Sequence, residues 1–372
     1  MIYIVVILVT LISAKLFGVK GYRTIEGLTV LGRKRRLRYV IFVSIMFILL
    51  MGLRFYQTGR DTEMYRIVYE NFGDTNRFSL LFSPGELYIG GVEPGWACLA
   101  WLCSHVMSYR GFLFIQSMLC IIPFAYVVYK KSYSPSLSFL LYILFNYLTW
   151  NMCASRQAPA VAFSLLAIYF YYNENKKKTL IAYLAALSFH FTAIIVLPFI
   201  LVQKYINKDG ILIAAIIISL GIGSAVMPLL LPYLRVDYTD DISNNSMGHL
   251  TYFGFLCLFL AIMYFKRKAK LSNSNSYYLF SVVIILWPML SSLAPAFRTV
   301  LYFLIYICFL IPELAVSYKR QALNRYLIIL MTIVIGSVYF NNLVYKPGAD
   351  VYPYYSVFEY SDDVNYPGLY ND

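Results

Sequence analysis

The sequence has little charge for its length. Only 13% of its 372 residues are Asp, Glu, Lys or Arg, whereas 60% are apolar and the mean hydropathy is +0.65. Soluble domains carry about 25% charged residues, so a water-soluble globule is excluded. The apolar residues form long blocks separated by short polar stretches, and about 20 apolar residues cross one bilayer as a helix. The pattern predicts an all-α polytopic integral membrane protein with about 10–12 transmembrane or half-membrane helices.

The sequence also lacks the motifs of several chemistries. Its six cysteines have no metal-ligand spacing, it has only three histidines, and it contains no Asp-x-Asp, Walker or glycine-rich nucleotide motif. We therefore expect no metal and no cofactor, and sugar nucleotides and ATP are poor candidate substrates. The net charge of +13 is interpreted as a property of loops beside a membrane, and no nucleic-acid partner is predicted.

The basic residues are unevenly distributed between the apolar blocks. One set of connecting stretches holds 22 Lys or Arg and three acids, and the remaining stretches hold nine Lys or Arg and 14 acids. Basic loops stay in the cytoplasm, so the first set is predicted to be inside and both termini outside. We interpret Met1 to Phe17 as a retained helix, not a signal peptide, because it has no basic n-region. The inner stretches are 15–38, 130–131, 174–178, 204–209, 266–270 and 319–325.

The apolar blocks give ten predicted crossings in one transmembrane domain that spans residues 1–372. Residues 94–107 are too short to cross, and residues 179–203 fit the charge distribution only as a re-entrant hairpin of half-helices with His190 near its outer tip. Three outer segments are expected, at 56–95, 233–248 and in the tail 344–372. The crossings are 2–17, 39–55, 110–129, 136–152, 157–173, 211–232, 249–265, 276–295, 299–317 and 326–343.

Polar residues that could carry chemistry are few, and on this topology they gather at the outer ends of helices. A charge between apolar helices is costly and usually functional, as for Arg156 in NMCASRQAPA. Several of these residues could also have a purely structural role, as a surface ion pair, a helix N-terminal acid, a core histidine or a snorkelling arginine. The candidates are Arg60, Asp61, Glu93, Asn151, Arg156, Gln157, His190 and Arg298.

The types of residue in this set point to one chemistry. Arginine stays charged and binds phosphate in a bidentate manner, so several together suit a lipid-linked phosphate or diphosphate. Histidine titrates near neutral pH and can take a proton from a hydroxyl nucleophile. Asp61 and Glu93 are alternatives to His190 as the base, or partners that orient it.

Four of these motifs also resemble a known family. GRDTEMY, EPGW, SRQAPA and SFHFTA occur in this order and at similar spacings in the EpsG/Wzy-type polysaccharide polymerases, and FRTVLYF and PYYSVFEY are similar to later parts of that family. The resemblance spans roughly residues 50–360. It implies a GT-C-like architecture and a metal-independent, inverting glycosyltransferase.

The resemblance further implies substrates and roles. A growing glycan on undecaprenyl diphosphate would be transferred to the non-reducing end of a second undecaprenyl-diphosphate-linked repeat unit, at the periplasmic face of the bacterial inner membrane. Arg156 would bind the diphosphate, with Arg298 and Arg60 as helpers, and Gln157 and Asn151 would bond to sugar or phosphate. His190 would be the general base. The expected partners are the lipid-linked oligosaccharides, the bilayer, a chain-length regulator and a flippase.

Three other functions stay open at this stage. A lipid-linked oligosaccharide flippase should show internal repeats, and none is evident. A membrane O-acyltransferase should show catalytic residues on the inner side, where only simple basic clusters occur. A glycan ligase shares the proposed chemistry and differs only in its acceptor.

Overall fold

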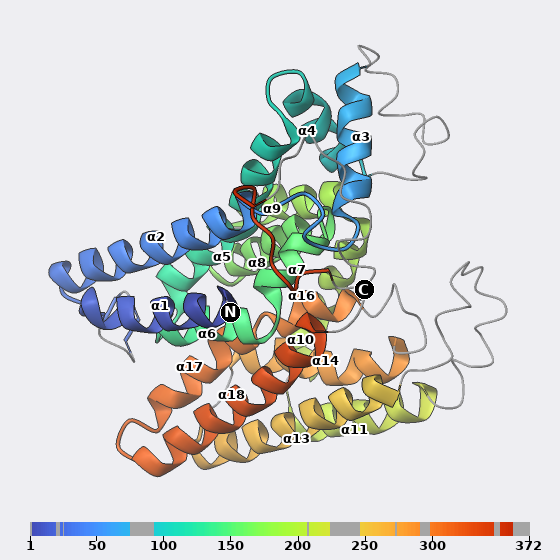
Figure 1. The fold of residues 1–372 in the computed structure, drawn as a ribbon. Coiled ribbons are helices and arrows are strands. Elements are labelled where there is room, and N and C mark those ends of the chain that lie inside the picture. Colours follow the sequence, from blue (N-terminus) through green and yellow to red (C-terminus); the bar gives the residue numbers. More distant parts are fainter. Residues whose placement is uncertain are drawn as a thin grey trace.

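The computed structural model describes residues 2–19, 23–24, 26–74, 93–206, 208–223, 246–271, 274–290, 298–345 and 350–359 (Figure 1). Within these ranges the chain is helical apart from its connections and one isolated β-bridge, between Arg54 and Ser356. The all-α class predicted from the sequence is therefore confirmed. Most of the predicted outer segment 233–248, and residues 75–92 of the segment 56–95, lie outside the described residues.

The helices differ widely in length. Four are long and apolar enough to cross a membrane, namely Tyr109–Lys131, Leu250–Lys268, Arg298–Ser317 and Ala322–Val344, and six shorter helices are also apolar. The elements in order are α1 Ile2–Leu16, α2 Val30–Gly52, α3 Thr62–Asp74, α4 Pro94–Ser104, α5 Tyr109–Lys131, α6 Pro135–Leu144, α7 Tyr147–Cys153, α8 Gln157–Tyr172, α9 Lys176–Phe189, η2 Phe191–Ile195, α10 Val196–Ile206, α11 Asp209–Gly221, α13 Ser246–Lys268, α14 Asn275–Leu290, η6 Arg298–Val300, α16 Leu301–Leu304, α17 Ile307–Ser317 and α18 Ala322–Val344.

Several predicted crossings are interrupted. The block 136–152 divides into α6 and α7 because Asn146 adopts a left-handed conformation with φ 68°, which an α-helix cannot continue through. The block 179–203 breaks at His190, whose extended backbone separates α9 from η2 and α10. α9 packs along α8, whereas α10 packs against η2 and α14. The side on which each half begins and ends stays a prediction.

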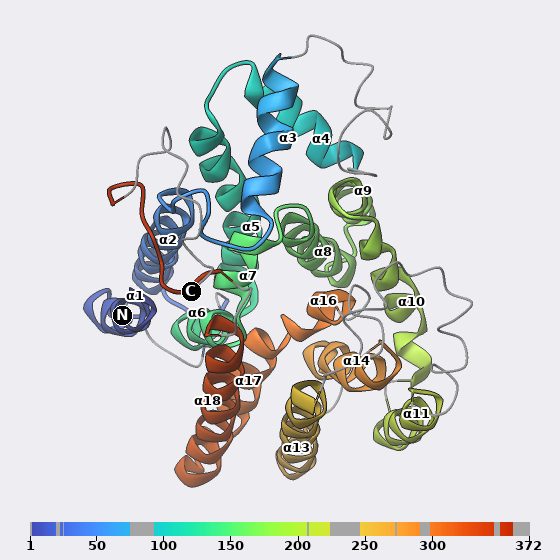
Figure 2. The same cartoon turned by 45° about the vertical axis from the view of Figure 1, so that its right-hand side comes forward.

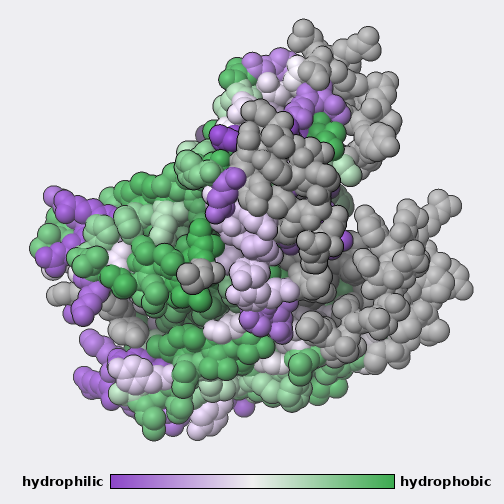
Figure 3. All heavy atoms as spheres, in the orientation of Figure 1, coloured by the Kyte–Doolittle hydropathy of each residue, from purple (hydrophilic) through white to green (hydrophobic). Residues whose placement is uncertain are grey.

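The outer surface of the helices is apolar. Figure 3 shows a hydrophobic band over the face formed by α1, α2, α17, α18 and α13, with hydrophilic side chains at the ends of these helices. Large side chains such as Leu16, Val30, Leu323 and Leu330 are more than half exposed. A contiguous apolar surface of this kind suits lipid and not water, so the protein is a multi-pass membrane protein.

Four of the six predicted inner stretches lie close to one another in pairs, 130–131 with 174–178 and 204–209 with 266–270. Lys131 lies over the ring of Tyr169, and Lys178 lies over that of Phe170, which brings the loop after α5 to the loop before α9. Lys266 and Arg267 at the end of α13 pair with Asp209 at the start of α11. α3 and α4 lie together beyond the other end of α5 (Figure 2).

Arg36, which belongs to the predicted inner stretch 15–38, is buried against neighbouring helices. Its side chain is only 1% exposed. The guanidinium donates to the carbonyls of Val128 and Ser132, both at 2.6 Å, and to that of Arg23 at 2.9 Å. The last carbonyls of a helix have no partner within it, so Arg36 satisfies the C-terminal end of α5 and fixes it to α2.

Replacing Arg36 should therefore destabilise the protein, whereas replacing its exposed neighbour Lys34 should not. Arg36→Gln removes the guanidinium donors from the carbonyls of Arg23, Val128 and Ser132, and we expect the free energy of unfolding to fall by about 2–4 kcal/mol. Lys34→Gln removes the same charge from the same helix and serves as the control. Unfolding of the purified proteins by SDS in mixed micelles measures the difference, and equal losses in both variants would contradict this role.

Candidate functional site

Three helix ends converge at the end of the molecule opposite the basic loops. Glu93 precedes α4, where Pro94 occupies the first helical position that proline favours. Arg156 ends the short connection from α7 to α8, and His190 ends α9. α4 approaches α9 closely at Gly95, where a Cβ atom would overlap Ser188. This close approach brings Glu93 next to His190.

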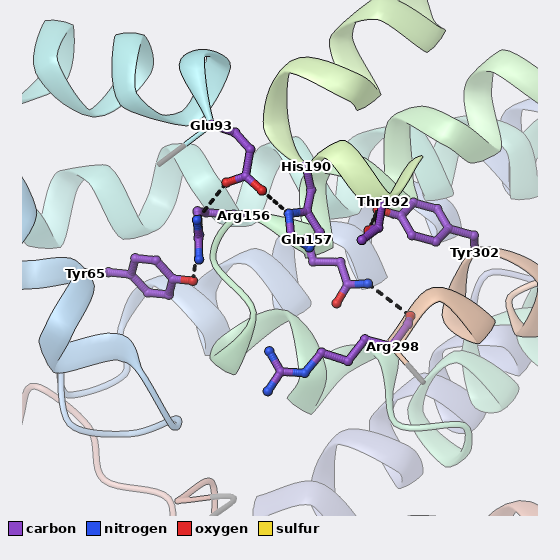
Figure 4. A network of polar contacts seen from close by, with 8 residues as sticks. All are labelled: Tyr65, Glu93, Arg156, Gln157, His190, Thr192, Arg298 and Tyr302. Atoms are coloured by element: carbon purple, nitrogen blue, oxygen red, sulfur yellow. Dashed lines mark hydrogen bonds and ion pairs between the residues drawn. The ribbon is translucent and has the colours of Figure 1, made fainter. Parts of the chain in front are cut away.

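Glu93 bonds to both of the other residues (Figure 4). Its Oε2 atom accepts from Nη1 of Arg156 at 2.8 Å, and its Oε1 atom is hydrogen-bonded to Nδ1 of His190. The Nε–H of Arg156 donates to the hydroxyl of Tyr65 at 3.1 Å, and its guanidinium lies 5.7 Å from the centroid of that ring. We call Glu93, Arg156, His190 and Tyr65 the carboxylate cluster.

The cluster is partly shielded from water. The side chains of Glu93, Arg156 and His190 are 14%, 22% and 23% exposed. Burial alone would raise the pKa of Glu93, but the hydrogen bond to His190 and the charge of Arg156 more than offset it and hold this pKa below its ordinary value. Burial also raises the pKa of Tyr65. Glu93 is therefore an ionised carboxylate at neutral pH, and Tyr65 is a neutral phenol.

A second group of polar residues lies beside the carboxylate cluster (Figure 4). Gln157 follows Arg156 and donates to the backbone carbonyl of Arg298 at 3.0 Å. The Arg298 guanidinium lies 5.4 Å from the ring centroid of Trp150, and the side chain is exposed. Among the described residues no carboxylate lies within ion-pair distance of Arg298. The hydroxyls of Thr192 and Tyr302 are 3.0 Å apart and connect η2 to α16.

Arg60 and Asp61 have exposed side chains on the loop between α2 and α3, most of whose other residues are buried. Gly59 has φ 109°, and a Cβ atom there would lie 2.6 Å from the carbonyl of Met152, so the turn requires glycine. The Gly59 amide donates to the Asp350 carbonyl of the C-terminal segment. Burial raises the pKa of the Asp350 carboxyl, an effect that the charge of Arg60 opposes and that of Asp61 increases.

The structure thus brings together some of the predicted residues and separates others. Glu93, Arg156 and His190 are in direct contact, and Gln157 and Arg298 adjoin them. The backbone carbonyl of Asp61 accepts from the amide of Tyr65, and the charge of its carboxylate adds to the raised pKa of the Tyr65 phenol. Asn151 is buried, and its amide donates to the hydroxyl of Tyr142, so it lies among helix-packing contacts.

Sequence reasoning did not select the aromatic and hydroxyl residues of the site. Tyr65, Trp150 and Tyr302 stand inside or beside the quoted motifs, but the chain has 36 tyrosines, so residue type alone could not single them out. Thr192 directly follows the HF pair of SFHFTA. Position within the motifs was the only signal available.

The helices and the polar cluster define a multi-pass membrane protein with one ionisable site at a helix-end junction. Comparison with known families then identifies it: the sequence model of the EpsG family matches residues 37–365, so the chain belongs to the EpsG family, which is a family of Wzy-type polymerases. No curated protein and no solved structure matches the chain. Membership gives the protein a polysaccharide polymerase role in general.

The lowered pKa of Glu93 predicts how stability depends on pH. A carboxylate whose folded-state pKa is depressed stabilises the fold above its ordinary pKa of about 4.3, and this contribution is lost as the pH falls through the lowered value. Glu93→Gln should cost about 1–2 kcal/mol at pH 7, because it leaves a partly buried Arg156 without its counter-charge.

Thermal unfolding of the parent and the Glu93→Gln variant in detergent between pH 7 and pH 3 measures this contribution. The difference between the two proteins should be constant above about pH 5 and shrink below about pH 4. A difference that stays constant down to pH 3, or that grows on acidification, would contradict the assignment of an ion-paired carboxylate.

Proposed function

We propose that the protein is a repeat-unit polymerase that transfers a growing glycan from undecaprenyl diphosphate to the non-reducing end of an undecaprenyl-diphosphate-linked repeat unit. The observation that carries the proposal is the joint bonding of Arg156 and His190 to Glu93. This arrangement places an oriented imidazole next to guanidinium groups. Both are needed when a hydroxyl attacks an anomeric carbon and a diphosphate leaves.

His190 is the general base in this proposal, and Glu93 is its orienting partner. A neutral imidazole whose Nδ1–H is bonded to a carboxylate presents its other nitrogen as the basic one. That nitrogen would take the proton from the acceptor hydroxyl while the carboxylate stabilises the imidazolium that forms. His190 and Glu93, which the sequence offered as alternative bases, therefore have different roles in the proposal.

The arginines would serve the leaving group. A lipid diphosphate carries negative charge as it departs, so cationic stabilisation helps more than an acid does. The charge of Arg156 is balanced by Glu93, whereas Arg298 is exposed over Trp150. We therefore infer that Arg298 makes the first contact with the diphosphate and that Arg156 borders the reacting centre. Arg60 lies further out, where it could attract the anionic substrates.

The location of the site supports transfer on the outer face of the inner membrane. The carboxylate cluster lies at the N-terminal end of α5, and the basic residues Lys130 and Lys131 lie at its other end. Since basic loops stay in the cytoplasm, the cluster faces the opposite side. A ligase would use the same geometry with a different acceptor. A flippase would not need an oriented imidazole, and an acyltransferase that draws its donor from the cytoplasm would need one on the inner side.

Removing the imidazole should abolish most of the activity. For His190→Ala we expect kcat for chain extension to fall by about 10²–10⁴-fold, the usual contribution of a general base. His105→Ala is the matched control, because that histidine is exposed and its hydrogen bonds among the described residues are to Trp101 and Ser104, outside the carboxylate cluster. Extension of a synthetic lipid-linked repeat unit by the purified protein, followed on gels, measures both. Equal rates in the parent and in His190→Ala would exclude His190 as the base.

Arg298→Ala should chiefly weaken binding of the donor. We expect KM for the lipid-linked donor to rise by about tenfold or more, since charge-assisted bonds to phosphate are worth about 1.5–3 kcal/mol each. Arg298→Lys keeps the charge but not the bidentate geometry, so its KM for the lipid-linked donor should lie between those of the parent and of Arg298→Ala.

Deletion of the gene separates the classes of function. Loss of a polymerase leaves single repeat units on the final carrier, loss of a flippase leaves none outside, and loss of an acyltransferase leaves full-length chains with altered decoration. Loss of a ligase leaves full-length chains on the lipid carrier.

A further inference from the structure

Ser155, which immediately precedes Arg156, is held by two buried side chains from other helices. Nε2 of Gln116 on α5 donates to its carbonyl at 2.7 Å and also bonds to its hydroxyl. Nε1 of Trp96 on α4 donates to the same hydroxyl at 3.2 Å. Trp96, Gln116 and Ser155 are 1%, 2% and 3% exposed. The connection that carries Arg156 is therefore fixed by buried side chains from two other helices.

The bond between Trp96 and Ser155 runs beside the ion pair of the site. Trp96 lies three residues after Glu93, and Ser155 lies one residue before Arg156. The start of α4 and the connection from α7 to α8 are thus joined at two points, one between Glu93 and Arg156 and one between Trp96 and Ser155. Two attachments restrict rotation of one segment on the other, which a single ion pair would allow.

Trp96 also contacts the other partner of Arg156. Its ring centroid lies 5.3 Å from that of Tyr65 and 5.8 Å from that of Phe112. Tyr65 accepts from the Nε–H of Arg156. Movement of Trp96 would therefore shift Glu93, Tyr65 and the connection before Arg156 together.

Gln116 connects this arrangement to the helical core. It lies on α5, the 23-residue helix that packs against both α2 and α8. The position of the Arg156 guanidinium is thus fixed through Ser155 to a helix of the packed core, and not only to the ends of helices.

We propose that Trp96, Ser155 and Gln116 are positioning residues that hold Glu93 and Arg156 in the geometry that glycosyl transfer requires. The proposal rests on the polymerase function above. It assigns to these three residues an effect on the rate of the chemical step and not on affinity for substrate. A misplacement of about 1 Å at a reacting centre can lower the rate by about 10²-fold.

The first experiment compares Ser155→Ala and Trp96→Phe with the parent and with Trp101→Phe. Trp96→Phe keeps an aromatic ring against Tyr65 and removes the donor together with part of the indole. Trp101→Phe makes the same change on the same helix, where Trp101 lies tilted against His105, and is therefore the matched control. For each of the first two variants we expect kcat to fall by about 10–100-fold with KM within about threefold of the parent, because the displaced groups still bind substrate. The double variant should be no slower than Ser155→Ala alone, since both changes remove the bond between Trp96 and Ser155, and Ser155→Ala also removes the bond of the hydroxyl to Gln116.

A purely structural role would give a different result. It would lower the melting temperature or the yield of folded protein and leave kcat per folded molecule unchanged. Unchanged kcat in Ser155→Ala and in Trp96→Phe therefore overturns the proposal. Gln116→Leu is a third test, with the same expected separation of kcat from KM.

The second experiment does not depend on catalysis. The Nε–H of Arg156, protected by its bond to Tyr65, should give an NMR signal that is absent in Arg156→Lys. Its exchange with water should be at least about tenfold faster in Ser155→Ala and Trp96→Phe than in the parent and Trp101→Phe, because a less restricted guanidinium opens more often.

Equal exchange rates in all four proteins overturn the positioning role. Failure of the parent to extend lipid-linked repeat units overturns the polymerase function instead, and the exchange measurement still decides the role of Trp96 and Ser155. The two ideas therefore fail separately.

Discussion

The arrangement of polar residues at the functional site of this membrane protein depends on the ionised carboxylate of Glu93. It balances the charge of Arg156 and orients the imidazole of His190, which lie at the ends of the successive helices α8 and α9, whereas Glu93 itself precedes the distant helix α4. Without that carboxylate, Arg156 would be a partly buried cation without a counter-charge, which is costly in a medium of low dielectric constant. The same residue therefore stabilises the junction and arranges the groups that we propose for glycosyl transfer.

The helices are broken where this junction requires it. α9 ends at His190 in extended backbone, α7 gives way to α8 through the connection that carries Arg156, and η6 begins at Arg298. Irregular backbone near a membrane is tolerated only where protein or a cavity covers it. Here the irregular backbone is covered by α4 and by the start of η2, and the buried side chains of Trp96 and Gln116 bond to Ser155 within it. The interruptions are thus the points at which side chains leave the apolar helices and can meet.

Part of this arrangement could be predicted without the structure. A charge between apolar blocks has few explanations, so Glu93, Arg156 and His190 could be selected as candidates one by one. The contacts between these three residues could not be predicted, because they depend on the close approach of α4 to α9 at Gly95. No local sequence pattern indicates that approach. The sequence equally could not show that the amide of Asn151, a predicted substrate-binding residue, bonds to Tyr142 within the helix packing. The positioning roles that we propose for Trp96 and Gln116 could not be predicted from the sequence, since a tryptophan or glutamine in an apolar helix carries no local signal of its partners.

The sequence by itself determined the helical class, the membrane environment and the clustering of basic loops at one end, because hydropathy and charge act locally along the chain. The ordered motifs also determined the family, which the match over residues 37–365 shows. Only the tertiary structure decided which ionisable groups touch, that the guanidinium of Arg36 is buried against the end of α5, and that the charges of Arg60 and Asp61 act on the carboxyl of Asp350. These contacts join helices that are distant in the sequence, and the packing of the whole bundle sets such distances.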